Sequence, residues 1–275
     1  MKVKIGCFCL FVTLFIGCMN DTNDQSSKII PKEKACYIPT IDYSIVERLP
    51  HDTSSFTEGL CFYNHQLYES TGSPENLPQT KSTLGVFNFK TGKIDIKVEL
   101  DRKKYFGEGI VVHDGKIYQL TYKNQVGFIY DAKTYNQVGQ FNYNNKEGWG
   151  LTSDGKYIIM SDGTSTLTYY DPKNMSMLKR LNVTNGGYDE DLINELEYIN
   201  GYIYANIWTK NYIVKIDPND GKIVGLLEMS ALVNEAKNLN SNCDVINGIA
   251  FDSISNKIYV TGKLWKNIYL IEFPH

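Results

Sequence analysis

A glutamate between two glycines is the first feature of this sequence that could do chemistry. It is Glu108, in the segment YFGEGI at residues 105–110. Strand interiors disfavour both glycine and charge, yet an apolar run follows directly. A carboxyl group held among apolar and aromatic neighbours keeps its proton to higher pH, which suits it to proton transfer. The segment therefore indicates an acid/base group near the start of a strand.

Similar segments recur along the chain, each combining a short apolar run with acid, amide or glycine. They are FTEGLCFY (56–63), FGEGIVVH (106–113), EGWGLTSD (147–154), INELEYIN (193–200) and INGIAFDS (246–253). Each is followed by a polar turn of hairpin type and further strand-like runs. The repeat length is near the roughly 40–50 residues of a four-stranded propeller blade.

Five such units fit the sequence. They predict an all-β fold, a five-bladed β-propeller of four-stranded blades over residues 41–275. The fifth unit is one strand short, and DYSIVERL (42–49) precedes the first unit as a spare strand. We expect this N-terminal strand to pair with the last blade and close the ring, which would remove an open edge. Residues 229–242 break the pattern and predict a helical insertion.

In a propeller the first strand of every blade lines the central channel. Polar residues at equivalent points of the five units should therefore meet at one mouth of it. We expect this set to be Glu58, Glu108, Glu147, Asn194 and Asn247. The alternative is that they only form hydrogen bonds around a narrow axis, with water or a cation.

Many motifs, in a fixed order from His51 to Phe273, resemble the glutaminyl cyclases of plants and bacteria, the papaya-latex type. They are HDTSSFTEGL, YESTG, YFGEGI, GFIYD, GWGL, SDGTS, NELEYINGYIYANIW, INGIAFD and TGKLW. Members of that family convert the N-terminal glutamine of a peptide into pyroglutamate with loss of ammonia, on a five-bladed propeller. The resemblance implies a glutaminyl-peptide cyclotransferase, an acyltransferase without a cofactor, whose partners are peptides or proteins with N-terminal glutamine.

The resemblance also assigns site residues. It makes Glu108 the general acid/base, and it implies that Lys263 or Asn194 donates a hydrogen bond to the carbonyl oxygen as charge develops there. Two positions depart from the family pattern, because Glu58 replaces a glutamine and Tyr122 replaces a tryptophan. An ionised Glu58 would raise the pKa of Glu108 further. The substrate pocket would consist of Phe56, Glu58, Phe106, Tyr122, Trp149 and Trp208.

The N-terminus has the features of a lipoprotein signal peptide, residues 1–17. A basic start, MKVK, precedes an apolar run too short for a normal membrane span. FIGC (15–18) resembles the bacterial lipoprotein signal, in which the cysteine, here Cys18, is lipidated and becomes the first residue. Residues 18–40 are then a flexible tether. We expect an exported protein, lipid-anchored to a membrane of the cell envelope; an ordinary cleaved signal is the alternative.

Other chemistries have little support in the sequence. A formal charge of −3 and the lack of a basic stripe give no case for nucleic acid. The histidines lack metal-ligand spacing, and no G-x-S-x-G elbow or phosphate loop is present. Two alternative functions stay open. One is a non-catalytic, membrane-anchored propeller that binds peptides or glycans, and the other is a metal-assisted hydrolase of lactones or esters.

Overall fold

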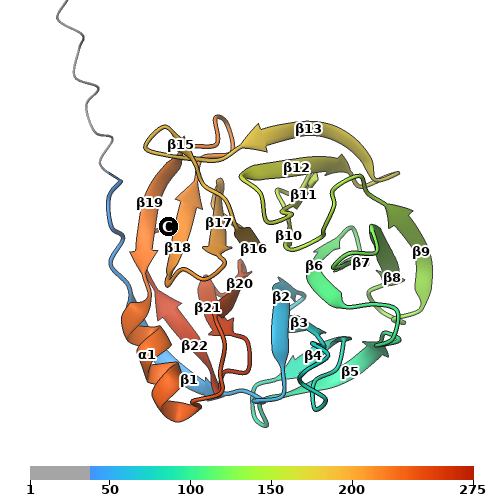
Figure 1. The fold of residues 1–275 in the computed structure, drawn as a ribbon, viewed down its shortest axis with the longest axis horizontal. Helices are drawn as coiled ribbons and strands as arrows, with labels where there is room; N and C mark the ends of the chain where they lie inside the picture. Colours follow the sequence, from blue (N-terminus) through green and yellow to red (C-terminus); the bar gives the residue numbers. More distant parts are fainter. Residues whose placement is uncertain (1–37) are drawn as a thin grey trace, which may run out of the picture. The chain divides into compact units, whose positions relative to one another are not determined.

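The computed structural model describes residues 38–275, which form five four-stranded sheets around a central axis (Figure 1). In four of these sheets the strands follow one another along the chain as antiparallel neighbours, with the first lying at the axis. The predicted all-β, five-bladed propeller of four-stranded blades is confirmed. The predicted signal peptide, Cys18 and most of the predicted tether lie outside the described residues.

The blades have the following strands. Blade 1 has β2 (Phe56–Tyr63), β3 (Gln66–Gly72), β4 (Thr83–Asn88) and β5 (Lys93–Glu99). Blade 2 has β6 (Gly107–His113), β7 (Lys116–Thr121), β8 (Val126–Asp131) and β9 (Gln137–Asn142). Blade 3 has β10 (Leu151–Ser153), β11 (Ile158–Met160), β12 (Thr166–Asp171) and β13 (Ser176–Asn182). Blade 4 has β16 (Ile193–Ile199), β17 (Tyr202–Ile207), β18 (Tyr212–Ile216) and β19 (Ile223–Glu228). Blade 5 has β20 (Ile246–Asp252), β21 (Lys257–Gly262), β22 (Asn267–Glu272) and β1 (Ser44–Pro50).

The fourth strand of blade 5 comes from the other end of the described chain. β1 pairs antiparallel with β22, from Ser44 opposite Glu272 to Pro50 opposite Asn267, and the two lie side by side in Figure 1. A two-stranded ribbon, β14 (Thr184–Asn185) and β15 (Tyr188–Asp189), precedes blade 4. No helix between residues 38 and 275 is long and apolar enough to cross a membrane.

The helical insertion expected at residues 229–242 is α1 (Ser230–Leu239). Its buried residues Leu232, Val233 and Ala236 join a hydrophobic cluster that blades 4 and 5 share. The periodic apolar face of the segment explains why it is helical, since three buried positions at this spacing lie on one side of a helix. The helix thereby covers an outer edge between the two blades, away from the axis (Figure 1).

Glycines in the inner strands let the blades approach one another closely. A Cβ atom on Gly59 would lie 2.7 Å from the backbone nitrogen of Ile110, and one on Gly109 would lie 2.5 Å from the backbone oxygen of Trp149. Each inner strand therefore packs its backbone against the next. This crowding accounts for the recurrence of glycine directly after Glu58 and Glu108 in the sequence.

In blade 4 the position of these glycines is taken by Glu195, whose carboxylate joins three blades. It accepts hydrogen bonds from the backbone N–H of Leu60 at 3.2 Å and of Ile249 at 2.8 Å. Glu197 likewise accepts a bond from Phe251 N–H at 2.7 Å. Burial raises the pKa of Glu195 well above its usual range and that of Glu197 to about 8. Both carboxyls therefore fasten blades together, and neither faces solvent.

Candidate active site

A cavity of about 210 Å³ opens at the mouth of the channel where the inner strands begin. The starts of the inner strands and the ends of the second strands meet there. The cavity is smaller than the roughly 300–1,000 Å³ of pockets that bind drug-sized ligands. Its size therefore suits one amino-acid side chain together with the backbone amine of the same residue. Its lining residues are Phe56, Glu58, Pro74, Phe106, Glu108, Tyr122, Trp149, Asn194, Trp208, Asp244 and Lys263.

The structure thus brings together all nine residues that the family resemblance placed in the site. It also adds two that the sequence analysis missed. Pro74 lies in the loop after β3, and Asp244 lies in the loop between α1 and β20. Neither belongs to a repeated strand, so the repeat pattern carried no signal for them. The Asp244 N–H donates to the Lys263 carbonyl at 2.9 Å, which fastens this loop beside the cavity.

The expectation that Glu147 is equivalent to Glu108 is wrong. Trp149 directly precedes Gly150, just as Glu108 precedes Gly109, and so Trp149 takes the equivalent place in blade 3. The inner strand of this blade starts only at Leu151, which leaves the preceding residues in a loop. Glu147 lies in that loop, outside the cavity, and accepts a hydrogen bond from Trp149 Nε1 at 2.9 Å.

Asn247 has the expected place in the repeat but does not line the cavity. It is fully buried, and its Nδ2 donates to the Thr57 carbonyl at 3.0 Å and to Glu58 Oε2 at 3.3 Å. It therefore acts on the site through Glu58. The buried polar residues that do line the cavity are Glu58, Glu108, Asn194 and Lys263, and Asp244 joins them from its loop.

Glu58 and Lys263 form an ion pair at the bottom of the cavity. Lys263 Nζ lies 2.8 Å from Oε1 and 2.7 Å from Oε2 of Glu58, and both side chains are almost fully buried. The same ammonium lies 4.6 Å from the centre of the Phe56 ring, a cation–π contact. Lys263 is thus already bonded to a carboxylate. The family resemblance implied a donor to the substrate at this position, and nothing in the sequence indicated this ion pair.

Glu108 lies beside this pair and is 4 % exposed. Burial raises the pKa of Glu108 well above its usual range, and the negative charge of Glu58 raises it further, against a smaller opposing effect of Lys263. Two close carboxyl groups in an apolar site cannot both be charged. Burial also raises the pKa of Glu58, but the Lys263 ammonium opposes that effect through its charge and a hydrogen bond. Of the two carboxyl groups, Glu108 therefore holds its proton to higher pH.

Asn194 lines the cavity and has a buried acceptor. Its Oδ1 has no hydrogen-bond partner within residues 38–275, and the residue is 3 % exposed. A buried polar atom without a partner is costly, and such atoms commonly mark a ligand contact. A donor on a bound molecule, such as an amine or a carboxamide N–H, would satisfy it.

Aromatic rings form the walls. Phe106 contacts Phe56 edge-to-face, with ring centres 6.2 Å apart, and contacts Tyr122 at 5.8 Å. On the other side Trp149 and Trp208 are perpendicular, with centres 5.8 Å apart. Trp208 is 42 % exposed and therefore stands at the entrance. The walls exclude water from the carboxyl groups while leaving one end open.

A buried histidine, paired with a glutamate, supports the segment that carries Lys263. His51 Nδ1 donates to the Trp265 carbonyl at 2.9 Å, and its Nε2 lies 3.1 Å from Glu69 Oε1. Both ring nitrogens therefore face acceptors. Burial lowers the pKa of His51, but the Glu69 carboxylate and these hydrogen bonds more than offset that effect and raise it. Through its hydrogen bond to the Trp265 carbonyl, His51 holds Trp265, two residues after Lys263, in place.

The described part of the chain offers little for other chemistries. Among residues 38–275, no three His, Cys, Asp or Glu side chains gather in a way that could hold a metal ion.

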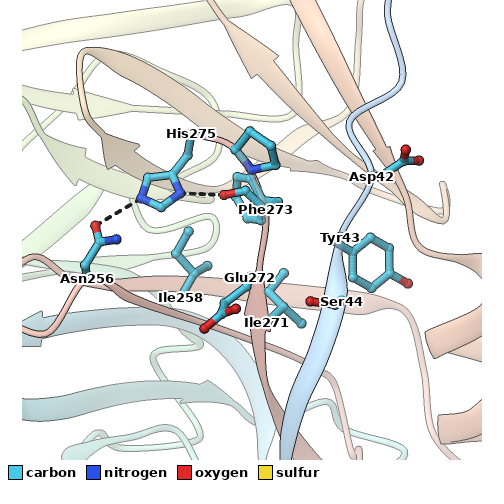
Figure 2. Close-up of a pocket in the computed structure, with 10 residues that line it drawn as sticks. Asp42, Tyr43, Ser44, Asn256, Ile258, Ile271, Glu272, Phe273 and His275 are labelled. Atoms are coloured by element: carbon cyan, nitrogen blue, oxygen red, sulfur yellow. Dashed lines mark hydrogen bonds between the residues drawn. The ribbon is translucent and has the colours of Figure 1, made fainter.

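A larger cavity, about 590 Å³, lies at the opposite end of blade 5, between β1, β22 and the residues after β22 (Figure 2). Asn256 and His275 are joined by a hydrogen bond there. None of the predicted site residues lines that cavity.

Comparison with known proteins gives three findings. The family model for glutamine cyclotransferase matches residues 13–273. A glutaminyl-peptide cyclotransferase of Arabidopsis thaliana is 38% identical over 233 residues, which cover 84% of this chain and 71% of the plant protein. The crystal structure of Myxococcus xanthus glutaminyl cyclase superposes with a TM-score of 0.78 and 31% identity, over 86% of this chain and 98% of that one.

Proposed function

The chain belongs to the glutamine cyclotransferase family, and we propose that it converts the N-terminal glutamine of peptides into pyroglutamate and ammonia with Glu108 as the proton carrier. It is an acyltransferase: the acyl group of the glutamine side chain passes from one nitrogen to another. The observation that carries the assignment to Glu108 is its position at the bottom of the cavity, buried next to the Glu58–Lys263 ion pair.

The cavity fits a glutamine side chain together with its α-amine. The aromatic walls contact the methylene groups, and the polar groups at the bottom face the carboxamide and the amine. Asn194 Oδ1, which lacks a partner among the described residues, accepts a hydrogen bond from one of these nitrogens. Because nucleophile and electrophile belong to one residue, folding the side chain back in the cavity replaces the entropic cost of bringing two molecules together.

The reaction needs one net proton transfer. The neutral α-amine attacks the side-chain carbonyl carbon, a C–N bond forms, and the bond to the carboxamide nitrogen breaks. Glu108 gives its proton to the leaving nitrogen, which departs as ammonia, and takes a proton from the attacking nitrogen. Glu108 is protonated again at the end, so the atoms and charges balance. The raised pKa of Glu108 suits the first half of this cycle, because the group begins as an acid.

The Glu58–Lys263 pair has a different role in this scheme. Burial and the negative charge of Glu58 favour the protonated form of Glu108, while the ammonium of Lys263 opposes the effect of burial on Glu58 and so favours its charged form. Negative charge that develops on the carbonyl oxygen is stabilised by N–H donors aimed at it. The Asn194 amide and the remaining N–H of Lys263 are the donors at the bottom of the cavity.

The test is ammonia release from a dipeptide that begins with glutamine. Glu108→Gln should lower kcat by about 10²–10⁴-fold, the range for loss of a general acid/base. Glu197→Gln is the matched control, since Glu197 is also a buried carboxyl with a raised pKa but does not line the cavity. Equal ammonia release by wild type and Glu108→Gln would remove Glu108 from the mechanism. No release by any form would favour a non-catalytic binder of peptides or glycans.

We propose further that the protein is exported and anchored to a membrane through lipid on Cys18. The support for this is the basic and apolar start of the sequence and the segment FIGC. Cys18→Ser should move the protein from the membrane fraction to the soluble fraction and abolish incorporation of a labelled fatty acid. Unchanged labelling in Cys18→Ser would contradict the anchor.

A further inference from the structure

We propose that a cleft on blade 3 binds the peptide residues that follow the glutamine, and that it favours a carboxylate there. This rests on the proposed function, because it extends the substrate from the same cavity. The cleft has a volume of about 560 Å³ and lies between the loop before β10 and the loop after β11. Its lining residues include Asn145, Lys146, Glu147, Trp149, Asp162 and Arg180.

Trp149 connects the cleft to the glutamine cavity, because it lines both. The glutamine side chain fills a small cavity, so its peptide carbonyl and the following residues must leave through the open end. A substrate peptide that passes over Trp149 enters the cleft directly. Because the cleft is continuous with the cavity, the residues after the glutamine can make their contacts with the protein there.

The Trp149 ring is held firmly between the two spaces. Its Nε1 donates to Glu147 Oε2 at 2.9 Å, and Trp208 contacts it edge-to-face. On the cleft side, a Cβ atom on Gly163 would lie 2.6 Å from its Cζ2 atom, so that loop packs directly against the ring. The indole is therefore a fixed boundary that lines both the cavity and the cleft.

The bottom of the cleft is also rigid. Asn145 is 6 % exposed, and its Nδ2 donates to Asp162 Oδ2 at 2.7 Å and to Thr168 Oγ1 at 3.1 Å. Its Oδ1 accepts a hydrogen bond from Tyr170 at 2.7 Å. Every polar group of this amide has a partner. A pre-formed surface binds a peptide without first having to be ordered.

The acidic side chains of the cleft have hydrogen-bond or ion-pair partners in the protein, and its basic side chains have none among the described residues. Glu147 accepts from Trp149 and lies 3.6 Å from Lys123, and Asp162 accepts from Asn145 and, at 2.6 Å, from Thr164 Oγ1. The exposed side chains of Lys146 and Arg180 make no hydrogen bond or ion pair with any described residue. The two basic side chains are therefore available to a carboxylate on a bound peptide. The free guanidinium presents a fork of donors that matches a carboxylate.

The test compares peptides that differ in one charge. C-terminally amidated tetrapeptides beginning with glutamine carry glutamate at the second, third or fourth position, and alanine peptides serve as the neutral reference. Wild type should show a higher kcat/KM for at least one glutamate peptide. Arg180→Gln should lower kcat/KM for that peptide by about 2- to 5-fold through KM, the range of an exposed ion pair. It should leave the alanine peptides and glutaminamide unchanged.

Two controls separate the cleft from other causes. Lys173→Gln removes an exposed positive charge from the same blade, but in the β12–β13 turn, which lies at the opposite end of the strands from the cleft. Lys173→Gln should leave kcat/KM unchanged for every peptide. Thr164→Trp places a bulky side chain in the cleft, and it should slow tetrapeptides but not glutaminamide. Equal wild-type rates for acidic and neutral peptides would overturn the inference, as would an Arg180→Gln effect common to all substrates. No reaction with glutaminamide would instead overturn the proposed function itself, and this inference with it.

Discussion

Lys263 and Glu58, 205 positions apart in the sequence, meet at the bottom of the channel with 2.8 Å between Nζ and Oε1. Glu58 begins the first blade and Lys263 follows the second strand of the last, so this ion pair joins the two ends of the propeller. Its charges also set the protonation of Glu108. The structure and the chemistry of the site therefore depend on the same contact.

Removing the lysine alone should destabilise the fold. Lys263→Met leaves the Glu58 carboxylate buried without its partner, and we expect the free energy of unfolding to fall by about 3–5 kcal/mol. The double variant Glu58→Gln/Lys263→Met removes both charges and should regain most of that loss without regaining activity. Urea denaturation of the three proteins measures the effect. Equal stability of the single and double variants would show that the charge of Glu58 is compensated in another way.

Replacing Glu58 by glutamine should change the pH dependence of the reaction. If Glu108 gives its proton to the leaving nitrogen, as proposed, kcat/KM of the wild type should fall at high pH as Glu108 loses that proton. Glu58→Gln removes the negative charge that raises the pKa of Glu108 and leaves the positive charge of Lys263, which lowers it. The alkaline limb should therefore move to lower pH. The acid limb reports the α-amine of the substrate, whose pKa is about 7.7–8, and should stay. An alkaline limb that stays in place would contradict the proton assignment.

Glu197 should make stability depend on pH. Burial raises its pKa to about 8 in the folded protein, compared with an ordinary value of 4.5. The folded form binds the proton more tightly, so this contribution to stability is present below pH 4.5 and is lost as the pH rises towards 8. At about 1.4 kcal/mol per pKa unit, the total loss is about 5 kcal/mol. Glu197→Gln keeps an acceptor for Phe251 N–H and removes the titration, so its melting temperature should fall less between pH 5 and pH 9. An equal fall in the melting temperature of wild type and Glu197→Gln over this pH range would contradict the prediction.

Trp208 should affect substrate binding more than stability. Its ring is 42 % exposed but contacts Trp149 edge-to-face at the entrance of the cavity. Trp208→Ala should raise KM for a glutamine dipeptide by about 2- to 10-fold, the scale of one aromatic contact, and should shift the melting temperature little. Tyr188→Ala, at an 82 % exposed aromatic away from the site, is the control and should change neither. A KM equal to that of wild type would exclude Trp208 from the binding site.

The repeating pattern of the sequence was sufficient for the architecture. Each blade consists of strands joined by short hairpins, so its contacts are local, and the period of the apolar runs predicts them directly. The same pattern placed Glu58, Glu108 and Asn194 at one mouth of the channel. Trp208, Tyr122 and Lys263 lie at the ends of second strands, where no pattern singles them out, and they were predicted only through the family resemblance.

The pairing of side chains across blades was decided by the tertiary structure alone. The sequence could not show that Lys263 binds Glu58, that Trp149 rather than Glu147 completes the ring of inner-strand residues, or that Asp244 reaches the cavity. It also held no sign that Glu195 joins three blades. Sequence periodicity describes neighbours along the chain. These contacts depend on how far each inner strand extends towards the axis and how each loop folds over the mouth, which only the closed arrangement of the five blades determines.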